Sequence, residues 1–109
     1  EKPEDKLGIL DLQLDVNNDE KIDVEIQLIE REDFIQRLLF YLSRLYDIQI
    51  KRGKKYSEVK RTVIIAILDY QLDLTRVIEE METKWNLREE DYPKKILTEA
   101  MDIYIQILF

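Results

Sequence analysis

Apolar and polar residues alternate in two stretches near the start of the chain. In residues 8–16 every second position is Leu or Val, and Asp or Gln fills most of the positions between them. The alternation resumes over residues 22–28, after residues 17–20, whose Asn and Asp side chains favour a turn. A period of two is typical of a half-buried β-strand, because successive residues face opposite sides of a sheet. The sequence therefore predicts a β-hairpin with one apolar and one polar face.

The period changes to that of an α-helix after the hairpin. Acidic residues at positions 30, 32 and 33 place negative charge where a helix begins, and Lys51, Arg52 and Gly53 form a stop signal. Apolar residues recur every three or four positions between them, so we predict a helix over residues 33–51 that packs one broad face on the sheet. That face consists of Phe34, Leu38, Tyr41, Leu42, Leu45 and Ile48, widened by Ile35, Leu39 and Tyr46.

A third strand, more apolar than the two of the hairpin, is predicted within residues 59–70. Its run VIIAIL at residues 63–68 is continuous and rich in β-branched residues, which is typical of an interior strand covered on both faces. A strand, a helix and another strand form a βαβ unit, whose connection is right-handed and whose strands are parallel. We therefore expect an α/β fold with a mixed sheet, made of the hairpin and the βαβ crossover.

The rest of the chain shows helical spacing of its apolar residues. We predict helices there, which divides the chain into a sheet-forming core at residues 1–70 and a helical C-terminal appendage at residues 71–109. The appendage ends on the apolar sequence IQILF, and an exposed apolar helix favours association, so a homo-oligomer formed through this helix is expected. The residues of the helical pattern are Val77, Ile78 and Met81, then Ile96, Ala100, Ile103, Tyr104 and Ile107.

Composition narrows the possible chemistry. The 109 residues contain no Cys and no His, which excludes disulfides, cysteine zinc sites and histidine bases, so any catalysis must use carboxylates and bound ions. The net charge of −7 argues against broad, non-specific binding of nucleic acid, although basic residues are concentrated between positions 51 and 61. No apolar run approaches the roughly 20 residues of a membrane helix, so no membrane association is expected and a cytoplasmic location is the default.

The polar face of the hairpin is the candidate site. Asp11 on the first strand and Glu25 and Gln27 on the second share this face, and two carboxylates can hold one hard cation such as Mg²⁺. The alternative is that the face is polar only because it is solvated, which is the commoner origin of such alternation. A helix end with a solvated loop is likewise the commoner origin of the basic stretch at residues 51–61.

Several segments together resemble the PD-(D/E)XK nuclease family transposases, which are relatives of the recombination-promoting nucleases. They are KLGILD (6–11), VEIQL (24–28), FYLSRLY (40–46), GKKYS (53–57) and the strand that ends in ILD (67–69). The resemblance covers about residues 6–70 and implies a core of restriction-endonuclease-like type. Such domains begin with a helix and usually another strand, so with ten residues before Asp11 the core is expected to be incomplete at its N-terminus.

The resemblance also implies the roles of individual residues. Asp11 and Glu25 become the metal ligands for Mg²⁺ or Mn²⁺, and Gln27 stands where the wider superfamily usually has a lysine. Glutamine brings no positive charge, so either Arg37 or Arg44 substitutes for it or activity is weak. Contacts to DNA phosphates are expected from Arg37, Arg44, Lys51, Arg52, Lys54 and Lys55.

Two functions are left open by the sequence. The first is a Mg²⁺-dependent DNA endonuclease that hydrolyses phosphodiester bonds, associated with a mobile element of bacterial type. The alternative is a catalytically inactive interaction module that retains the nuclease fold, favoured by the net acidity, the incomplete N-terminus and the expected apolar C-terminal helix.

Overall fold

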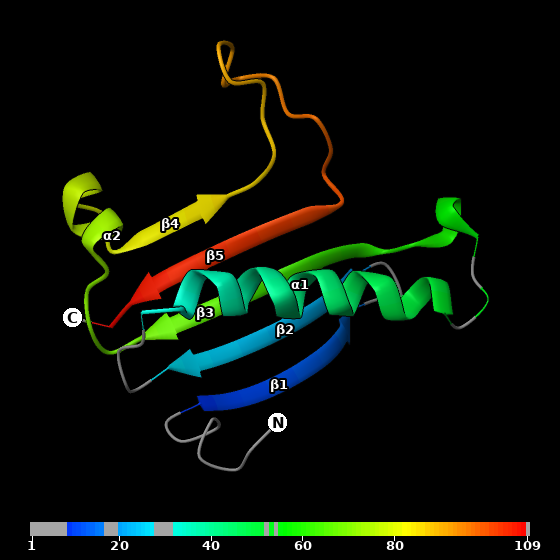
Figure 1. Cartoon of the computed structure of the whole chain (residues 1–109), viewed down its shortest axis with the longest axis horizontal. Coiled ribbons are helices and arrows are strands. Elements are labelled where there is room, and N and C mark those ends of the chain that lie inside the picture. Colours follow the sequence, from blue (N-terminus) through cyan, green and yellow to red (C-terminus); the bar gives the residue numbers. More distant parts are fainter. Residues whose placement is uncertain (1–8, 17–19, 28–31, 52, 54, 109) are drawn as a thin grey trace.

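The chain forms one five-stranded mixed sheet with helices packed against it (Figure 1). The computed structural model describes residues 9–16, 20–27, 32–51, 53 and 55–108. The strand order in the sheet is β1-β2-β3-β5-β4. In chain order the elements are β1 (Ile9–Val16), β2 (Glu20–Gln27), α1 (Phe34–Lys51), the 3₁₀ turn η2 (Tyr56–Glu58), β3 (Arg61–Leu68), α2 (Asp73–Ile78), β4 (Glu82–Trp85) and β5 (Met101–Ile107).

The predicted hairpin and βαβ unit are both confirmed. β1 and β2 pair antiparallel along all eight residues, and β2 pairs in parallel with β3. In chain order α1 lies between β2 and β3, and it crosses in front of the sheet (Figure 1). The connection from β2 to β3 is right-handed, which is the hand that twisted strands favour. The helix begins and ends within one residue of its predicted limits. The expected α/β class with a mixed sheet is therefore observed.

The prediction that residues 71–109 are helical is wrong. α2 is a single short helix, and β5 pairs in parallel with β3 in the interior of the sheet, with β4 beside it at the edge. The three isoleucines of β5, Ile103, Ile105 and Ile107, recur at every second position, as they do in a strand. Because β-branched residues favour strands, this segment forms a strand although its spacing also fits a helix. The sheet thus crosses the boundary expected at residue 70.

The expected association through an apolar C-terminal helix is wrong for the same reason. Ile105 and Ile107 are buried inside the sheet layer, with 3% and 1% of their surface exposed, so they are part of the core. In the part of the chain that the structure describes, no helix is both long and apolar enough to span a membrane.

The core lies between α1 and the central strands. On α1 the residues Phe34, Leu38, Leu42 and Leu45 are buried, as predicted. Leu39 and Ile48 are 50% and 37% exposed, so the buried stripe is narrower than the sequence indicated. The sheet contributes Ile64, Ala66, Leu68, Ile105 and Ile107 to the same cluster. Removing such side chains from water is the main source of stability in a domain of this size.

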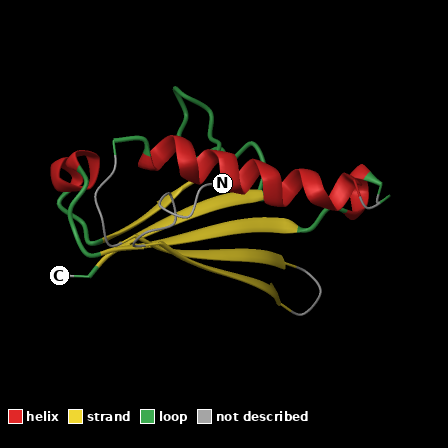
Figure 2. Ribbon diagram, turned by 60° about the horizontal axis from the view of Figure 1, so that its bottom comes forward, coloured by secondary structure: helices red, strands yellow, loops and turns green. Residues whose placement is uncertain are grey.

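Both helices lie on the same side of the sheet (Figure 2). β3 shows the consequence, because Thr62, Ile64, Ala66 and Leu68 on its α1 side are fully buried. On its other side Val63 is buried, but Ile65 and Ile67 are only partly so. The predicted cover on both faces of this strand is therefore confirmed on the α1 side and incomplete on the other.

Candidate active site

The strand register brings the predicted site residues to neighbouring positions. Asp11 on β1 is the direct partner of Glu25 on β2, and Gln27 lies two residues further along β2, opposite Ile9. Directly paired residues of adjacent strands share one face of the sheet, with Cβ atoms about 4.5–5.5 Å apart. The register thus places Asp11, Glu25 and Gln27 on one face. The side chains of these three residues lie outside the part of the structure that is described.

That face is the one on which α1 packs. β2 is in register with β3, so that Glu25 pairs with Ala66 and Gln27 with Leu68, and both partners are fully buried under α1. A face that is polar only because it is solvated is expected to point away from the core. The hairpin is arranged in the opposite way, with its polar positions on the helix side of the sheet. The polar stripe therefore lies on the face that carries the helix, beside the part of β3 that α1 covers.

The surface of α1 carries an arginine and a tyrosine that contact each other. The Arg37 Nη2 atom donates a hydrogen bond to the Tyr41 hydroxyl at 3.0 Å, and the guanidinium carbon lies 5.7 Å from the centre of the tyrosine ring. The ring of Phe40 meets the Tyr41 ring edge-on at 5.7 Å. These residues line a shallow hollow together with Gln36 and Arg44. The helix thus presents a positively charged hollow with aromatic walls.

The other predicted phosphate contacts continue along the helix. Arg44 and Lys51 line a second shallow hollow, and Lys51 forms an exposed ion pair with Asp47 at 2.9 Å. Lys55 is exposed just beyond the helix. Arg52 and Lys54 lie outside the described residues. Arg37 and Arg44 therefore line one hollow, and Arg44 and Lys51 line the next one along the helix. Lys55 lies on the loop that follows the helix.

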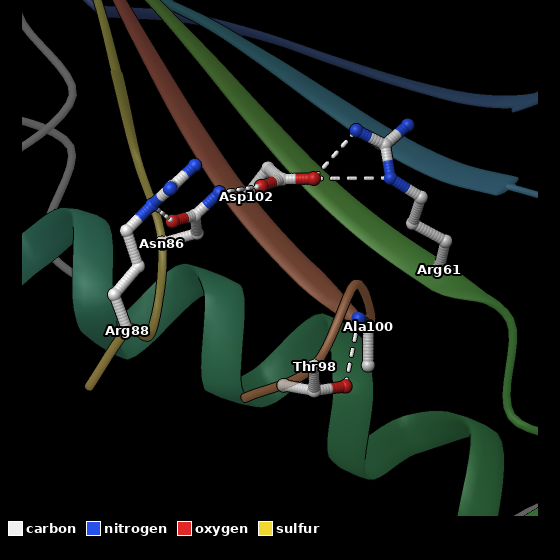
Figure 3. A network of polar contacts seen from close by, with 6 residues as sticks. All are labelled: Arg61, Asn86, Arg88, Thr98, Ala100 and Asp102. Carbon is white, nitrogen blue, oxygen red and sulfur yellow. Dashed lines mark hydrogen bonds and ion pairs between the residues drawn. The ribbon is translucent and has the colours of Figure 1, made fainter. Parts of the chain in front are cut away.

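A charge network around the buried Asp102, which the sequence did not reveal, joins β3, β5 and the segment after β4 (Figure 3). Asp102 on β5 is only 3% exposed, and its Oδ2 atom accepts hydrogen bonds from Arg61 Nε at 3.0 Å and Nη2 at 2.5 Å. Its Oδ1 atom accepts one from Asn86 Nδ2 at 3.0 Å, and the Asn86 side-chain oxygen accepts one from Arg88 Nε at 2.6 Å. The sequence signal for this network is a charged residue, Asp102, in a strand whose alternate positions are isoleucine.

This network stands apart from the candidate site. Asp102 pairs with Val63, whose neighbours Thr62 and Ile64 face α1, so Asp102 lies on the opposite face of the sheet. The carboxylate is saturated by an arginine fork and an amide, which is the requirement for burying a charge without losing stability. The network is therefore structural, and it ties β3, β5 and the segment after β4 together.

The donors at the hairpin fit a hard cation. Among the described side chains no group of three His, Cys, Asp or Glu residues is placed to hold a metal ion. The register of Asp11 and Glu25, however, opposes two carboxylates across adjacent strands. Mg²⁺ takes oxygen ligands at about 2.1 Å and retains several waters, so carboxylates at two paired positions are the residue types that such an ion would use.

The comparison with protein families agrees with this geometry. The family model of the PD-(D/E)XK nuclease family transposases matches residues 1–108. The chain belongs to this family. The family resemblance seen in residues 6–70 is thus confirmed, and the match continues through β4 and β5, so the C-terminal part belongs to the family domain as well. No curated protein and no solved structure matches the chain. The mixed sheet with its crossover helix is compatible with an α/β fold of PD-(D/E)XK type.

Proposed function

We propose that this PD-(D/E)XK family member is a Mg²⁺-dependent DNA endonuclease whose active site is the α1 side of the β1–β2 hairpin. The observation that carries the proposal is the direct pairing of Asp11 with Glu25 on the face that α1 covers, in a chain whose family is one of nucleases. Family and geometry support it independently, because the family match does not depend on where the helix packs.

Each residue of the site has a separate role in this proposal. The carboxylates of Asp11 and Glu25 bind the divalent ion, Mg²⁺ or Mn²⁺. The bound ion supplies an activated water and neutralises charge on the phosphate. The amide of Gln27 hydrogen-bonds the attacking water or a phosphate oxygen and thereby orients it. Because Gln27 has no positive charge, the charge must come from another part of the site.

The proposed DNA contacts follow α1. Arg37 and Arg44 on the hollow, Lys51 at the helix end and Lys55 beyond it contact backbone phosphates, with Arg52 and Lys54 in the same stretch. Such contacts position a duplex without reading its sequence. The chain as a whole has a net charge of −7, so binding depends on this local group of basic residues and weakens as salt is added.

Nicking of supercoiled plasmid tests the function. The chain is incubated with plasmid and Mg²⁺, beside its Asp11→Ala and Glu25→Ala variants. Asp73→Ala is the matched control, because Asp73 is an acid with a 98% exposed side chain on the separate helix α2. We expect nicking by the parent chain and by the control, and none by the two site variants or after removal of Mg²⁺ with EDTA. A folded parent chain that leaves the plasmid intact would contradict the proposal.

A second candidate is a catalytically inactive interaction module. It is favoured by the loop that connects β4 and β5, which projects from the edge of the sheet (Figure 1). This loop exposes Leu87, Tyr92 and Leu97 by 50%, 69% and 77%, and exposed apolar groups mark interaction surfaces. The same plasmid experiment separates the two candidates, because an interaction module shows no Mg²⁺-dependent nicking to be lost in Asp11→Ala.

A further inference from the structure

Two hydrogen bonds of the buried Gln49 side chain fix the position of α1 along the sheet. Gln49 Nε2 donates to Thr62 Oγ1 at 3.2 Å, and its Oε1 atom accepts from the backbone N–H of Lys60 at 3.0 Å. Both Gln49 and Thr62 are fully buried. The helix therefore cannot slide along β3, and positions on α1 can be related to positions on the strands.

This anchor sets Tyr41 level with Glu25. From Thr62 to Ala66, the β3 partner of Glu25, the strand advances by four residues, or about 13 Å. A helix covers the same distance in about nine residues, and α1 runs opposite to β3, so the level of Glu25 corresponds to residues 40–41. Two strand residues further, the level of Gln27 corresponds to residues 36–37. Arg37 and Tyr41 thus lie beside Gln27 and Glu25.

The handedness of the helix turns the same two residues towards the hairpin. Leu38, Leu42 and Leu45 face the sheet. On a right-handed helix with about 100° per residue, positions 37 and 41 lie about 60–100° to one side of this line. Because α1 is antiparallel to β2 and the crossover is right-handed, that side points to β2 and β1 and the opposite side to β5 (Figure 1).

Arg37 is also held in place by its partner. The hydrogen bond at 3.0 Å and the ring contact at 5.7 Å orient the guanidinium on Tyr41, and the Phe40 ring contacts the Tyr41 ring edge-on. Among the described residues no aromatic ring contacts Arg44 in this way. The same anchor places Arg44 level with Asp23 and Ile64, two strand residues before the level of Glu25. A charge that is already oriented costs less to use in a transition state than one that must first be ordered.

We infer that Arg37, oriented by Tyr41, supplies to the Asp11–Glu25 site the positive charge that Gln27 lacks. Tyr41 is a positioning residue in this scheme, and Arg44 is a peripheral phosphate contact. The inference rests on the proposed nuclease function for its catalytic consequence, whereas the level of Arg37 beside positions 25 and 27 of β2 follows from the anchor of α1 on β3.

Two measurements on the full chain test it. The variants are Arg37→Gln, Tyr41→Phe and Arg44→Gln, with Arg76→Gln on α2 as the control for loss of one positive charge. The first measurement is kcat and KM for Mg²⁺-dependent plasmid nicking. The second is the affinity for Mn²⁺ without DNA, followed by titration calorimetry. Circular dichroism confirms that each variant is folded.

The expected results differ between the two arginines. Arg37→Gln lowers kcat about 100-fold, the size found when one preorganised donor is removed, and Tyr41→Phe lowers it about tenfold with little change in KM. Arg44→Gln mainly raises KM. Arg37→Gln binds Mn²⁺ about threefold to tenfold more tightly than the parent chain, because a positive charge proposed to lie near the metal ligands has been removed. The Mn²⁺ affinity of Arg76→Gln is unchanged.

Equal effects of Arg37→Gln and Arg44→Gln on both measurements would overturn the inference. If the parent chain binds Mn²⁺ but does not nick DNA, the nuclease function fails, and the Mn²⁺ affinities alone decide whether Arg37 lies at the carboxylates. If neither the parent chain nor any variant binds Mn²⁺, the metal site and the role of Arg37 are both rejected.

Discussion

Two neighbouring strands of the sheet use the same face for opposite purposes. On β3 that face consists of Ile64, Ala66 and Leu68, all fully buried beneath α1. On β2 their direct partners are Asp23, Glu25 and Gln27. The two strands are parallel and in register, but α1 packs mainly over β3. The side chains follow this difference, so that one half of the face is core and the other half is a candidate for chemistry.

The structural part of the molecule, which includes the network on the opposite face of the sheet, treats its polar residues differently from the hairpin. Asp102 and Gln49 are buried, and each has several hydrogen-bond partners within the protein. Substitutions there are expected to lower stability without a specific effect on catalysis, whereas substitutions at the hairpin stripe are expected to change activity and metal binding. The predictions below test this division.

The largest loss of stability is expected for Asp102→Ala. The change removes the two hydrogen bonds that the mostly buried Arg61 guanidinium donates to Asp102, and it removes the acceptor of the Asn86 amide. Breaking a buried pair by removing one partner costs about 3–5 kcal/mol, which is a large share of the stability of a small domain. Urea denaturation followed by circular dichroism measures the free energy of unfolding.

The surface pair of Arg76 and Asp73 provides the control for this prediction. Their side chains are 62% and 98% exposed, and exposed ion pairs contribute about 0–1 kcal/mol. Asp73→Ala should therefore leave the free energy of unfolding within about 1 kcal/mol of the parent value. If Asp102→Ala were no more harmful than Asp73→Ala, the network of Figure 3 would have no structural role.

A smaller loss is expected for Gln49→Ala, which removes the anchor between α1 and β3. The backbone N–H of Lys60 loses its acceptor and the Thr62 hydroxyl loses a donor, and leaving buried groups unsatisfied costs about 1–3 kcal/mol. Hydrogen exchange of the β3 amides should accelerate along with global unfolding. Gln36→Ala on the exposed side of the same helix is the comparison, and an equal loss there would show that helix propensity alone is responsible.

The hairpin stripe is expected to respond in the opposite direction. Asp11→Asn should raise the free energy of unfolding by about 0.5–1 kcal/mol in the absence of divalent ions, because like charges directly opposite each other destabilise a strand pair. Added Mg²⁺ should stabilise the parent chain and not the variant, since a ligand stabilises only the state that binds it. Thermal melts with EDTA and with Mg²⁺ measure both effects. A loss of stability in Asp11→Asn would place Asp11 in the structural half instead.

The first two thirds of the fold follow from local patterns. The alternation of β1 and β2 and the period of α1 each extend over eight or more residues, and the sequence of residues 17–20 favours a turn between the two strands. Local spacing and the right-handed crossover rule therefore determine the arrangement. The pairing of Asp11 with Glu25 follows in the same way, because a short turn fixes the register of a hairpin.

The remaining third depends on contacts distant in sequence. Ile103 and Ile107 are four residues apart, which fits a helix and a strand equally well, and only the pairing of β5 with β3 decides between them. Arg61 and Asp102 are 41 residues apart, so no local pattern predicts their contact. The face of the hairpin on which α1 packs is likewise a tertiary result. The contact of Arg37 with Tyr41 is the exception, because a spacing of four on a helix is visible in the sequence.

The smallest predicted effect concerns DNA binding by the loop after α1. Lys55 is exposed and lies beyond the C-terminal end of α1, whereas the level of Glu25 corresponds to residues 40–41 of that helix. Lys55→Gln should therefore leave kcat unchanged and weaken DNA binding slightly, whatever the DNA sequence. Each lost phosphate contact reduces the slope of log K against log salt by about 1, so fluorescence anisotropy at several salt concentrations detects it. Lys84→Gln is the matched control, because Lys84 packs over Tyr104 on the face opposite α1. An equal change of slope in both variants would mean that DNA contacts the whole surface, and the division of the molecule into a structural and a DNA-binding half would then fail.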